Sequence, residues 1–260
     1  MFMNQNNIIL ETHGLRKEFG GLVAVDDVSV QIERGSTHSI IGPNGAGKTT
    51  FFNLLTGKHK PTRGSVIYKG EDITNLPVHR RAHNGIGRSF QITNIFPNLT
   101  VLENVRLAVQ ALEGVGFRFW RQTASYPDYT RRALDILERL GLAAVATKAA
   151  TVLPHGGKRK LELAILLAAQ PELLLLDEPT AGMASEQVPE LMKIIEEIGA
   201  TGDKTIVMVE HNMNVVMGIS DRITVMSSGQ VLTEGTPAQI AADKMVQSVY
   251  LGELYDLPEA

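Results

Sequence analysis

The chain has 260 residues, of which 43% are hydrophobic and 20% charged, and 25 lysines and arginines against 28 aspartates and glutamates give a net charge of −3. This composition is that of a globular protein, and it excludes a mostly disordered chain and gives no general nucleic-acid-binding surface. Cysteine is absent, which excludes disulfide scaffolds, cysteine-ligated zinc and thiol catalysis. Because no apolar stretch approaches the roughly 20 residues that span a bilayer and no signal-peptide pattern is present, we expect a soluble protein of the cytoplasmic side.

Short aliphatic and β-branched runs alternate with helical patterns along the chain. In chain order, strands are predicted at 28–32, 37–41, 65–68, 173–177, 205–209, 222–226 and 230–234, and helices at 49–55, 102–112, 130–140, 160–168 and 187–198. Ser228-Gly229, between the last two strands, is a two-residue hairpin signal. Strands prevail before about residue 90, helices between 100 and 170, and strand–helix alternation returns afterwards. This order predicts an α/β core with parallel strands, a helical insertion and an antiparallel edge.

The segment G-P-N-G-A-G-K-T-T at 42–50 matches the phosphate-loop pattern G-x-x-x-x-G-K-[ST] between a predicted strand and a predicted helix. Glycines let backbone N–H groups turn toward phosphate oxygens, and the helix that follows directs its positive end at the same anion. Lys48 adds a charge at the β- and γ-phosphates, and the Thr49 hydroxyl is a Mg²⁺ ligand. The alternative is a glycine-rich turn with a chance Lys-Thr pair. The expected nucleotide-binding residues of this loop are Asn44, Gly45, Ala46, Gly47, Lys48, Thr49 and Thr50.

An apolar leucine run at 173–176 is followed directly by Asp177 and Glu178. Such a run is typical of a strand that is buried on both faces of a parallel sheet. Asp177 then emerges at the carboxyl end of the sheet, where α/β proteins bind ligands, and we expect it to support Mg²⁺ through water. Glu178 is expected to polarise the attacking water in line with the γ-phosphate. The alternative is a strand end followed by two solvated acids.

These motifs, with the segments between and after them, resemble the ATP-binding subunits of ABC (ATP-binding cassette) transporters over about residues 8–252. The resemblance implies an ATPase that uses ATP and Mg²⁺. It also implies a P-loop NTPase (RecA-like) core with a mostly parallel sheet, an antiparallel β subdomain and a helical insertion. The expected organisation is one ATPase domain at 8–254, with its core at 8–90 and 170–240, a helical insertion at 91–169 that carries the signature region, and a C-terminal tail at 241–260.

The resemblance assigns roles to residues outside the two motifs. Phe19 matches the aromatic position that stacks on adenine, the alternative being a core aromatic, and Val25 is expected to contact the nucleotide as well. Gln91 matches the glutamine that senses Mg²⁺ and the attacking water and links them to the helical insertion. His211 matches the histidine that hydrogen-bonds the γ-phosphate, the alternative being an ordinary surface histidine.

Three segments look like those of the ATPases of branched-chain amino-acid importers, in particular the longer of their two ATPase types. They are D-E-P-T-A-G-M at 177–183, V-E-H-N-M at 209–213 and Y-L-G-E at 250–253, and the long insert after Gln91 agrees with them. The resemblance implies a peripheral protein on the inner face of the cell membrane that couples ATP hydrolysis to the import of branched-chain or other small amino acids or amides.

The implied partners are a second ATPase subunit, two membrane permease subunits and, indirectly, a periplasmic solute-binding protein. A heterodimer is expected and a homodimer stays open. Three alternatives remain: a non-hydrolytic or slow nucleotide-dependent regulator, another ABC system such as lipopolysaccharide export, and a soluble cassette that acts on nucleic acid. The last is disfavoured because the chain has no tandem cassette and no strong basic patch, so no nucleic-acid partner is expected.

The signature segment departs from the family pattern L-S-G-G-Q, because L-P-H-G-G stands at 153–157. Pro154 offers neither a hydroxyl nor an N–H, whereas the amides of Gly156 and Gly157 remain, and a one-residue slip makes His155 a side-chain donor. In a heterodimer this predicts one competent and one weakened ATP site, unless His155 and the glycine amides suffice. Ala184 stands where many cassettes carry aspartate, which affects the expected dimer contacts.

Two further segments predict contacts with partners. Ile95, Phe96 and Leu99 match the region that lines a groove for a helix of the membrane subunit, the alternative being the core of the helical insertion. The cluster F-R-F-W-R at 117–121 is interpreted as a structural or partner contact rather than a lipid-binding patch.

Overall fold

The computed structural model describes residues 7–89, 95–112 and 127–248. Gln91, the 117–121 cluster and the 250–253 segment lie outside the described residues. Among the residues described, no helix is long and apolar enough to cross a membrane.

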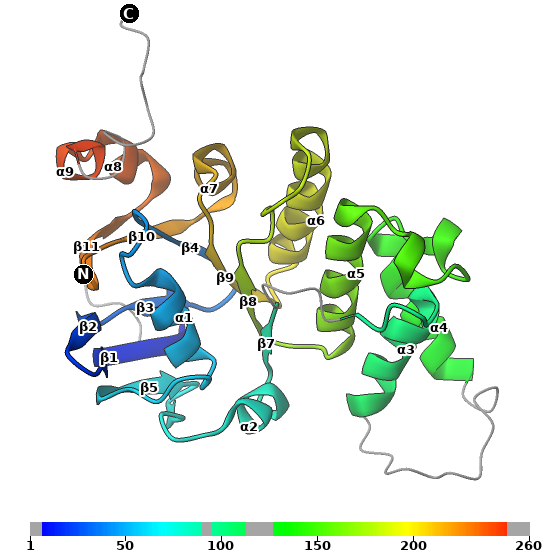
Figure 1. Cartoon of the computed structure of the whole chain (residues 1–260), viewed down its shortest axis with the longest axis horizontal. Helices are drawn as coiled ribbons and strands as arrows, with labels where there is room; N and C mark the ends of the chain where they lie inside the picture. Colours follow the sequence, from blue (N-terminus) through cyan, green and yellow to red (C-terminus); the bar gives the residue numbers. More distant parts are fainter. Residues whose placement is uncertain (1–6, 90–94, 113–126, 249–260) are drawn as a thin grey trace, which may run out of the picture.

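A six-stranded sheet, with five strands parallel and one antiparallel at its edge, forms the centre of the fold (Figure 1). The predicted strands at 37–41, 173–177 and 205–209 are confirmed to the residue, and the hairpin at Ser228-Gly229 is confirmed by the positive φ of both residues. From edge to edge the strands are β11 (Gln230–Gly235), β10 (Arg222–Ser227), β4 (Thr37–Ile41), β9 (Thr205–Val209), β8 (Leu173–Asp177) and β7 (Ile86–Arg88).

A second, antiparallel sheet packs beside the first. It contains β2 (Leu22–Val28), β1 (Ile8–Phe19), β5 (Arg63–Tyr68) and β6 (Glu71–Asp72) in that order, with β3 (Gln31–Glu33) also paired to β1. The single strand predicted at 28–32 is wrong, because the chain leaves β2 at Val28 and enters β3 only at Gln31. β1 was not predicted; its register is broken by bulges, and Gly14 within it has a φ of +55°.

The helices cover both faces of the six-stranded sheet. α1 (Lys48–Leu55) lies on one face, and its two phenylalanines and two leucines pack with residues of both sheets in one hydrophobic core. α6 (Val188–Ala200) packs on the opposite face. Shorter helices occupy the connections and the chain end: α2 (Val78–His83), α7 (Met213–Ile219), α8 (Pro237–Ala242) and α9 (Lys244–Val246).

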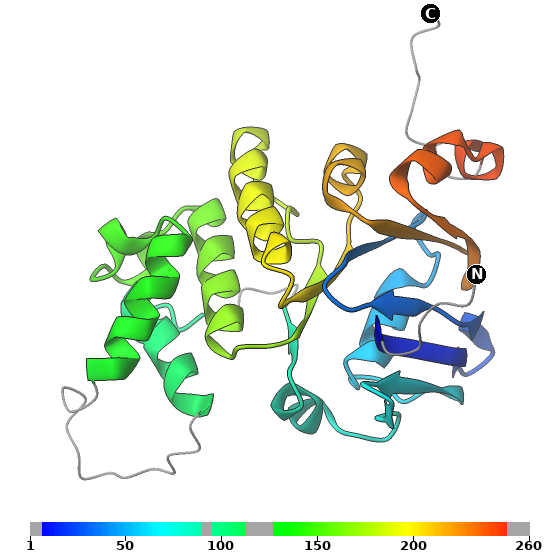
Figure 2. The same ribbon diagram turned by 180° about the vertical axis from the view of Figure 1, so that it is seen from behind.

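Three helices form a separate part at one end of the molecule, as both views show (Figures 1 and 2). They are α3 (Val101–Leu112), α4 (Pro127–Arg139) and α5 (His155–Ala168). α5 starts five residues earlier than the predicted helix at 160–168, because the chain turns helical directly after Pro154 despite two glycines that disfavour helix. The domain boundaries given above stay a prediction.

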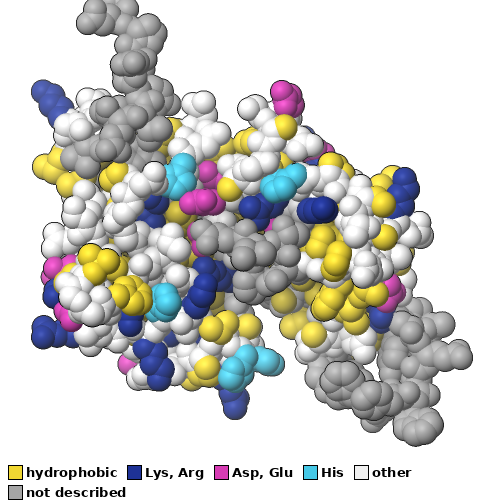
Figure 3. Space-filling view, viewed as in Figure 1, with side chains coloured by type: hydrophobic (Ala, Val, Ile, Leu, Met, Phe, Trp, Pro, Cys, Tyr) yellow, Lys and Arg dark blue, Asp and Glu magenta, His cyan; other side chains and the backbone are white. Residues whose placement is uncertain are grey.

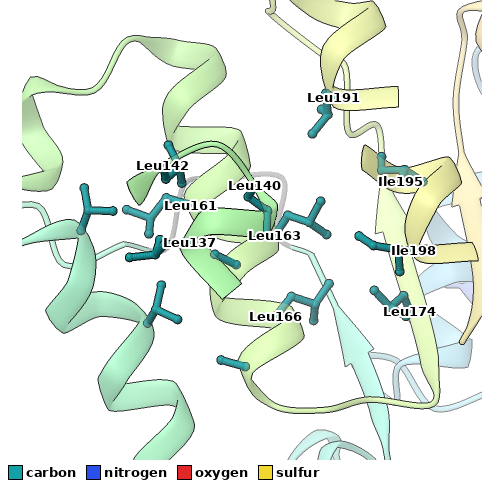
Figure 4. Packing of buried hydrophobic residues seen from close by; sticks show 14 of the residues in the cluster. Leu137, Leu140, Leu142, Leu161, Leu163, Leu166, Leu174, Leu191, Ile195 and Ile198 are labelled. Carbon is teal, nitrogen blue, oxygen red and sulfur yellow. The ribbon is translucent and has the colours of Figure 1, made fainter. Parts of the chain in front are cut away.

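β8 carries the helical part on one of its faces and α1 on the other. Leu174 and Leu176 pack with α5 and α6, as Figure 4 shows for Leu174 beside Leu166 and Ile198, whereas Leu173 and Leu175 face the core that contains α1. All four side chains are buried, which confirms the prediction of a strand with two buried faces. The end of β8 therefore lies where the core and the helical part meet.

Candidate functional site

The phosphate loop connects β4 to α1 at the carboxyl edge of the six-stranded sheet. A Cβ at Gly42 would overlap the carbonyl oxygen of Met226, and a Cβ at Gly47 would overlap that of Ala24. Gly47 also has a φ of +94°, so glycine is required there by space and by conformation. The expected loop conformation is thus imposed by strands on both sides of it, because Met226 belongs to β10 and Ala24 to β2.

Lys48 is the first residue of α1 and turns its side chain back over the loop. Its ammonium nitrogen donates hydrogen bonds to the carbonyl oxygens of Gly42 and Pro43 at 2.6 and 2.9 Å. Burial lowers the pKa of Lys48, and the nearby charge of Glu178 opposes that shift. Of its neighbours, Ala46 is buried in the core, whereas Asn44 and Thr49 are exposed. The charge of Lys48 is thus confined to the loop on which a phosphate would lie.

Asp177 is the last residue of β8 and its side chain is completely buried. Its Oδ2 accepts a hydrogen bond from an Arg88 nitrogen at 3.1 Å, and its Oδ1 has no partner among the described residues. Burial raises the pKa of this carboxyl group, and the hydrogen bond and charge of Arg88 oppose the shift. A buried carboxylate oxygen without a donor, on a strand that contacts the helix carrying Thr49, suits Mg²⁺ bound through water.

Glu178 and His211 meet at the ends of two neighbouring strands. β8 and β9 pair in parallel with Asp177 opposite Val209, and His211 Nε2 shares a hydrogen bond of 2.9 Å with Glu178 Oε1. Both side chains remain partly exposed, at 28% for Glu178 and 41% for His211. Glu178 has a φ of +48°, an unfavourable conformation for glutamate. An acid and a histidine from separate motifs thus lie together beside the phosphate loop.

The two residues expected to contact the base differ in their surroundings. Phe19 ends β1 and is 42% exposed, with its ring edge-on to His59 at a centroid distance of 5.3 Å. The alternative that Phe19 is a core aromatic is therefore wrong, and its ring has a free surface. Val25 is fully buried in the core between the sheets. Its side chain offers no surface to a nucleotide, which corrects the expectation of a contact.

The signature segment begins α5. Pro154 occupies the N-cap position and provides no side-chain hydrogen bond, and His155, the first helical residue, is exposed. Gly156 is buried, and a Cβ there would lie 2.7 Å from the Gln187 side-chain oxygen. The His155 ring lies beside Gly182, in the loop that follows Glu178. The backbone amides at the start of α5 therefore have no side-chain cap.

Two residues of this region went unrecognised in the sequence. Arg88 joins Asp177 to α1, because it also donates hydrogen bonds to Asn53 and Thr56 at 2.8 and 2.9 Å. Glu210 is buried between the loops that follow β8 and β9. The signal in both cases is a charged residue directly at the end of a short apolar strand, where burial forces it to find partners. Gln91 lies outside the described residues.

A groove lies between the core and the helical part. A cavity of about 300 Å³ is bordered by α2, β7, α3 and α5, with apolar residues such as Val78, Ala108 and Leu166 on its walls and Arg81 and Arg88 among its polar residues. Figure 3 shows the hollow, with hydrophobic side chains on both sides of it. Phe96 and Leu99 are exposed and do not line this cavity, and Ile95 packs partly against the helical core.

The whole chain is similar to ATP-binding proteins of ABC transporters. The family model described as ABC transporter matches residues 25–181. The chain is 42% identical over 250 residues to the high-affinity branched-chain amino acid transport ATP-binding protein LivG of Escherichia coli (strain K12), a match that covers 94% of this chain and 98% of LivG. Identity is 38%, with the same coverage, to BraF of Pseudomonas aeruginosa, which carries the same description. It is 34% to the lipopolysaccharide export system ATP-binding protein LptB of Acidithiobacillus ferridurans, over 96% of this chain and 99% of LptB.

Solved structures give the same result. The ADP conformation of MJ1267, an ATP-binding cassette of an ABC transporter, matches with a TM-score of 0.82 and 30% identity over 94% of this chain and 99% of that one. The dimeric cassette MJ0796 bound to ADP and Pi matches with a TM-score of 0.75 and 28% identity, over 88% and 99%. These structures confirm the expected α/β ATPase fold, and the family match supports the binding of ATP. The chain therefore belongs to the ABC transporter family and is one of its ATP-binding cassettes.

Proposed function

We propose that this cassette is the ATP-hydrolysing subunit of an importer for branched-chain or other small amino acids or amides. The observation that carries the hydrolytic part is the contact between Glu178 and His211 at the sheet edge that also holds the phosphate loop. The solute class is supported by the descriptions of LivG and BraF, which are more similar to this chain than LptB is. A lipopolysaccharide exporter is the less supported alternative.

The residues of the site divide the chemistry among them. The loop amides and Lys48 bind the triphosphate, and Glu178 orients the attacking water while His211 donates to the γ-phosphate. Thr49 and Asp177 would hold Mg²⁺, with Gln91 as a further ligand, and the ion supplies charge neutralisation at the phosphate oxygens. Phe19 stacks on the adenine with its exposed ring. The site then acts by placing charges and a water molecule around a phosphate that it holds in position.

The groove supports an interaction with membrane subunits. Its largely apolar lining, with a few polar residues, suits one amphipathic helix from a permease subunit, which would place this chain at the inner face of the cell membrane. The dimeric MJ0796 cassette supports pairing with a second cassette, and a heterodimer is the form that we propose. A solute-binding protein would reach the assembly only through the permease.

The altered signature supports unequal ATP sites in such a heterodimer. The uncapped amides of α5 and the exposed His155 would complete the partner's ATP site, whereas the site built on Lys48 and Glu178 would use the partner's signature. By analogy with an oxyanion hole, one missing donor costs about 2.7–4 kcal/mol, so the partner's site would be slower by two to three decades. A slow nucleotide-dependent regulator is the second candidate, and only Pro154 favours it.

Two variants of the full-length chain test the proposed chemistry. Lys48→Ala should abolish ATP binding in calorimetry, and Glu178→Gln should keep ATP binding while hydrolysis falls at least a hundredfold. Full hydrolysis by Glu178→Gln, or unchanged ATP binding by Lys48→Ala, would contradict the assignment. Co-purification with polytopic membrane proteins and ATP-dependent uptake of leucine by the reconstituted assembly test the transport role. Equal losses from the Glu→Gln change in either cassette would contradict unequal sites.

A further inference from the structure

A buried carboxylate joins the two loops that carry the hydrolytic pair. Glu210 follows β9 directly, is 2% exposed, and has no cationic partner among the ion pairs of the described residues. A buried carboxylate is strongly disfavoured unless hydrogen bonds replace its lost hydration. The hydrogen-bond partners of Glu210 therefore indicate what a buried carboxylate does at this position.

Both oxygens of Glu210 accept hydrogen bonds, and each serves a different loop. Oε1 accepts from the backbone N–H and the hydroxyl of Thr180 at 2.9 and 2.5 Å. Oε2 accepts from the backbone N–H groups of His211 and Asn212 at 2.9 and 3.3 Å. Four donors thus surround one carboxylate, two from the loop after β8 and two from the loop after β9. Charge-assisted hydrogen bonds of this kind are the strong ones.

The two loops are those on which the proposed chemistry depends. Thr180 stands two residues after Glu178, and His211 stands next to Glu210 itself. Glu178 keeps a φ of +48°, which a glutamate adopts only when its surroundings impose it. The Glu178 N–H donates to the Val209 carbonyl at 2.9 Å, and the bonds from Thr180 to Glu210 hold the loop a short distance further on. Glu178 is therefore attached to the end of β9 through its own N–H and, two residues further on, to the Glu210 side chain through Thr180.

We propose that Glu210 is a positioning residue for ATP hydrolysis: its carboxylate clamps the Glu178 loop to the His211 loop and so fixes the contact between their side chains. Glu210 lies next to the phosphate-binding residue His211 without being assigned any contact with nucleotide itself. The inference rests on the proposed roles of Glu178 and His211. A glutamine would fit the same space, but its NH₂ group would meet the N–H donors of one of the loops, so that one half of the clamp would be lost.

The test uses Glu210→Gln in the full-length chain, in the assembly that hydrolyses ATP. We expect kcat to fall at least tenfold while the KM for ATP stays within threefold, because the phosphate loop is untouched. Thr180→Val, which removes the hydroxyl donor, should lower kcat by a smaller factor, and Thr180→Ser, which keeps it, should restore the wild-type value. Hydrogen exchange should become faster at the amides of 178–183 and 210–212 and stay unchanged elsewhere.

The matched control is Glu234→Gln. Glu234 is partly buried and, like Glu210, accepts several hydrogen bonds, from the Arg222 side chain and the Thr224 hydroxyl. It joins β11 to β10 near the start of β10, away from the phosphate loop. This variant should lower the melting temperature without a selective fall of kcat. An unchanged kcat in Glu210→Gln, or an equal fall in Glu234→Gln, would overturn the inference. Full hydrolysis by Glu178→Gln would instead overturn the proposed function, so the two failures are distinguishable.

Discussion

Lowering the pH from 7 to 5 should destabilise the folded chain through one buried histidine on β4. The ring of His38 is fully buried; its Nε2 hydrogen-bonds the Thr224 hydroxyl at 2.7 Å, and its Nδ1 has no partner among the described residues. Burial lowers the pKa of His38 from 6.5 to about 4; the charge of Glu234 opposes this shift and that of Arg222 adds to it. The folded chain thus keeps this histidine neutral at a pH where an exposed one is protonated.

The size of the effect follows from the two pKa values. As the pH falls below 6.5, the unfolded chain takes up a proton at His38 and the folded chain does not, so the free energy of unfolding decreases. Between pH 7 and pH 5 the loss amounts to about 2 kcal/mol, and it reaches about 3 kcal/mol below pH 4, where both states are protonated. For a domain with an ordinary stability of about 5–15 kcal/mol this is a large fraction.

The assay compares urea unfolding of the wild type with that of His38→Gln at several pH values. Glutamine keeps an N–H donor for the Thr224 hydroxyl and does not titrate, so it removes the protonation while retaining the hydrogen bond. We expect the wild type to lose about 2 kcal/mol relative to the variant between pH 7 and pH 5. A difference in unfolding free energy that stays constant over this range would refute the reasoning, because the depressed pKa would then make no contribution.

Three further predictions concern two largely buried arginines and one tightly packed glycine. Arg81→Met should lower the free energy of unfolding by about 3 kcal/mol in urea titrations, because four backbone carbonyls at the end of α1 and before α2 lose the guanidinium donor, and among them only that of Leu54 keeps another hydrogen bond within the described residues, from the Gly57 N–H. Arg88→Met should cost about 3–5 kcal/mol in the same assay, because Asp177 would be left as a buried charge without a partner; an unchanged midpoint would show that this ion pair does not stabilise the fold. Gly47→Ala should lower the free energy of unfolding more than Gly202→Ala does. Both glycines have a positive φ, which is +73° at Gly202, but a Cβ at Gly202 would meet nothing within 4 Å. Similar losses would mean that the backbone conformation, rather than the lack of space, determines the cost.

Sequence patterns a few residues long predicted those strands and loops whose conformation depends mainly on their own residues. The leucine run at 173–176 predicted a strand with two buried faces, and the glycines before Lys48 predicted a tight loop between a strand and a helix, as the structure has them. β1 was not predicted because its own residues show no clear apolar pattern. It is extended because it pairs with three other strands, β2, β3 and β5. Val25 was misjudged for a similar reason, since only the packing of two sheets shows that its side chain points into the core.

Arg88 and Glu210 contact other residues of the site rather than the phosphate loop itself. Their contacts depend on the order and register of the strands, which cannot be derived from a single sequence. Arg88 reaches Asp177 because β7 pairs with β8, and Glu210 reaches Thr180 because β8 pairs with β9 with Asp177 opposite Val209. A shift of one residue in that register would turn every side chain of the strand to the opposite face and separate Glu178 from His211. A buried carboxylate that accepts hydrogen bonds from the loops after both strands, as Glu210 does for β8 and β9, stabilises the register that brings Glu178 and His211 together. Positioning residues are therefore to be sought at the carboxyl ends of neighbouring parallel strands, directly beside the residues that a motif identifies.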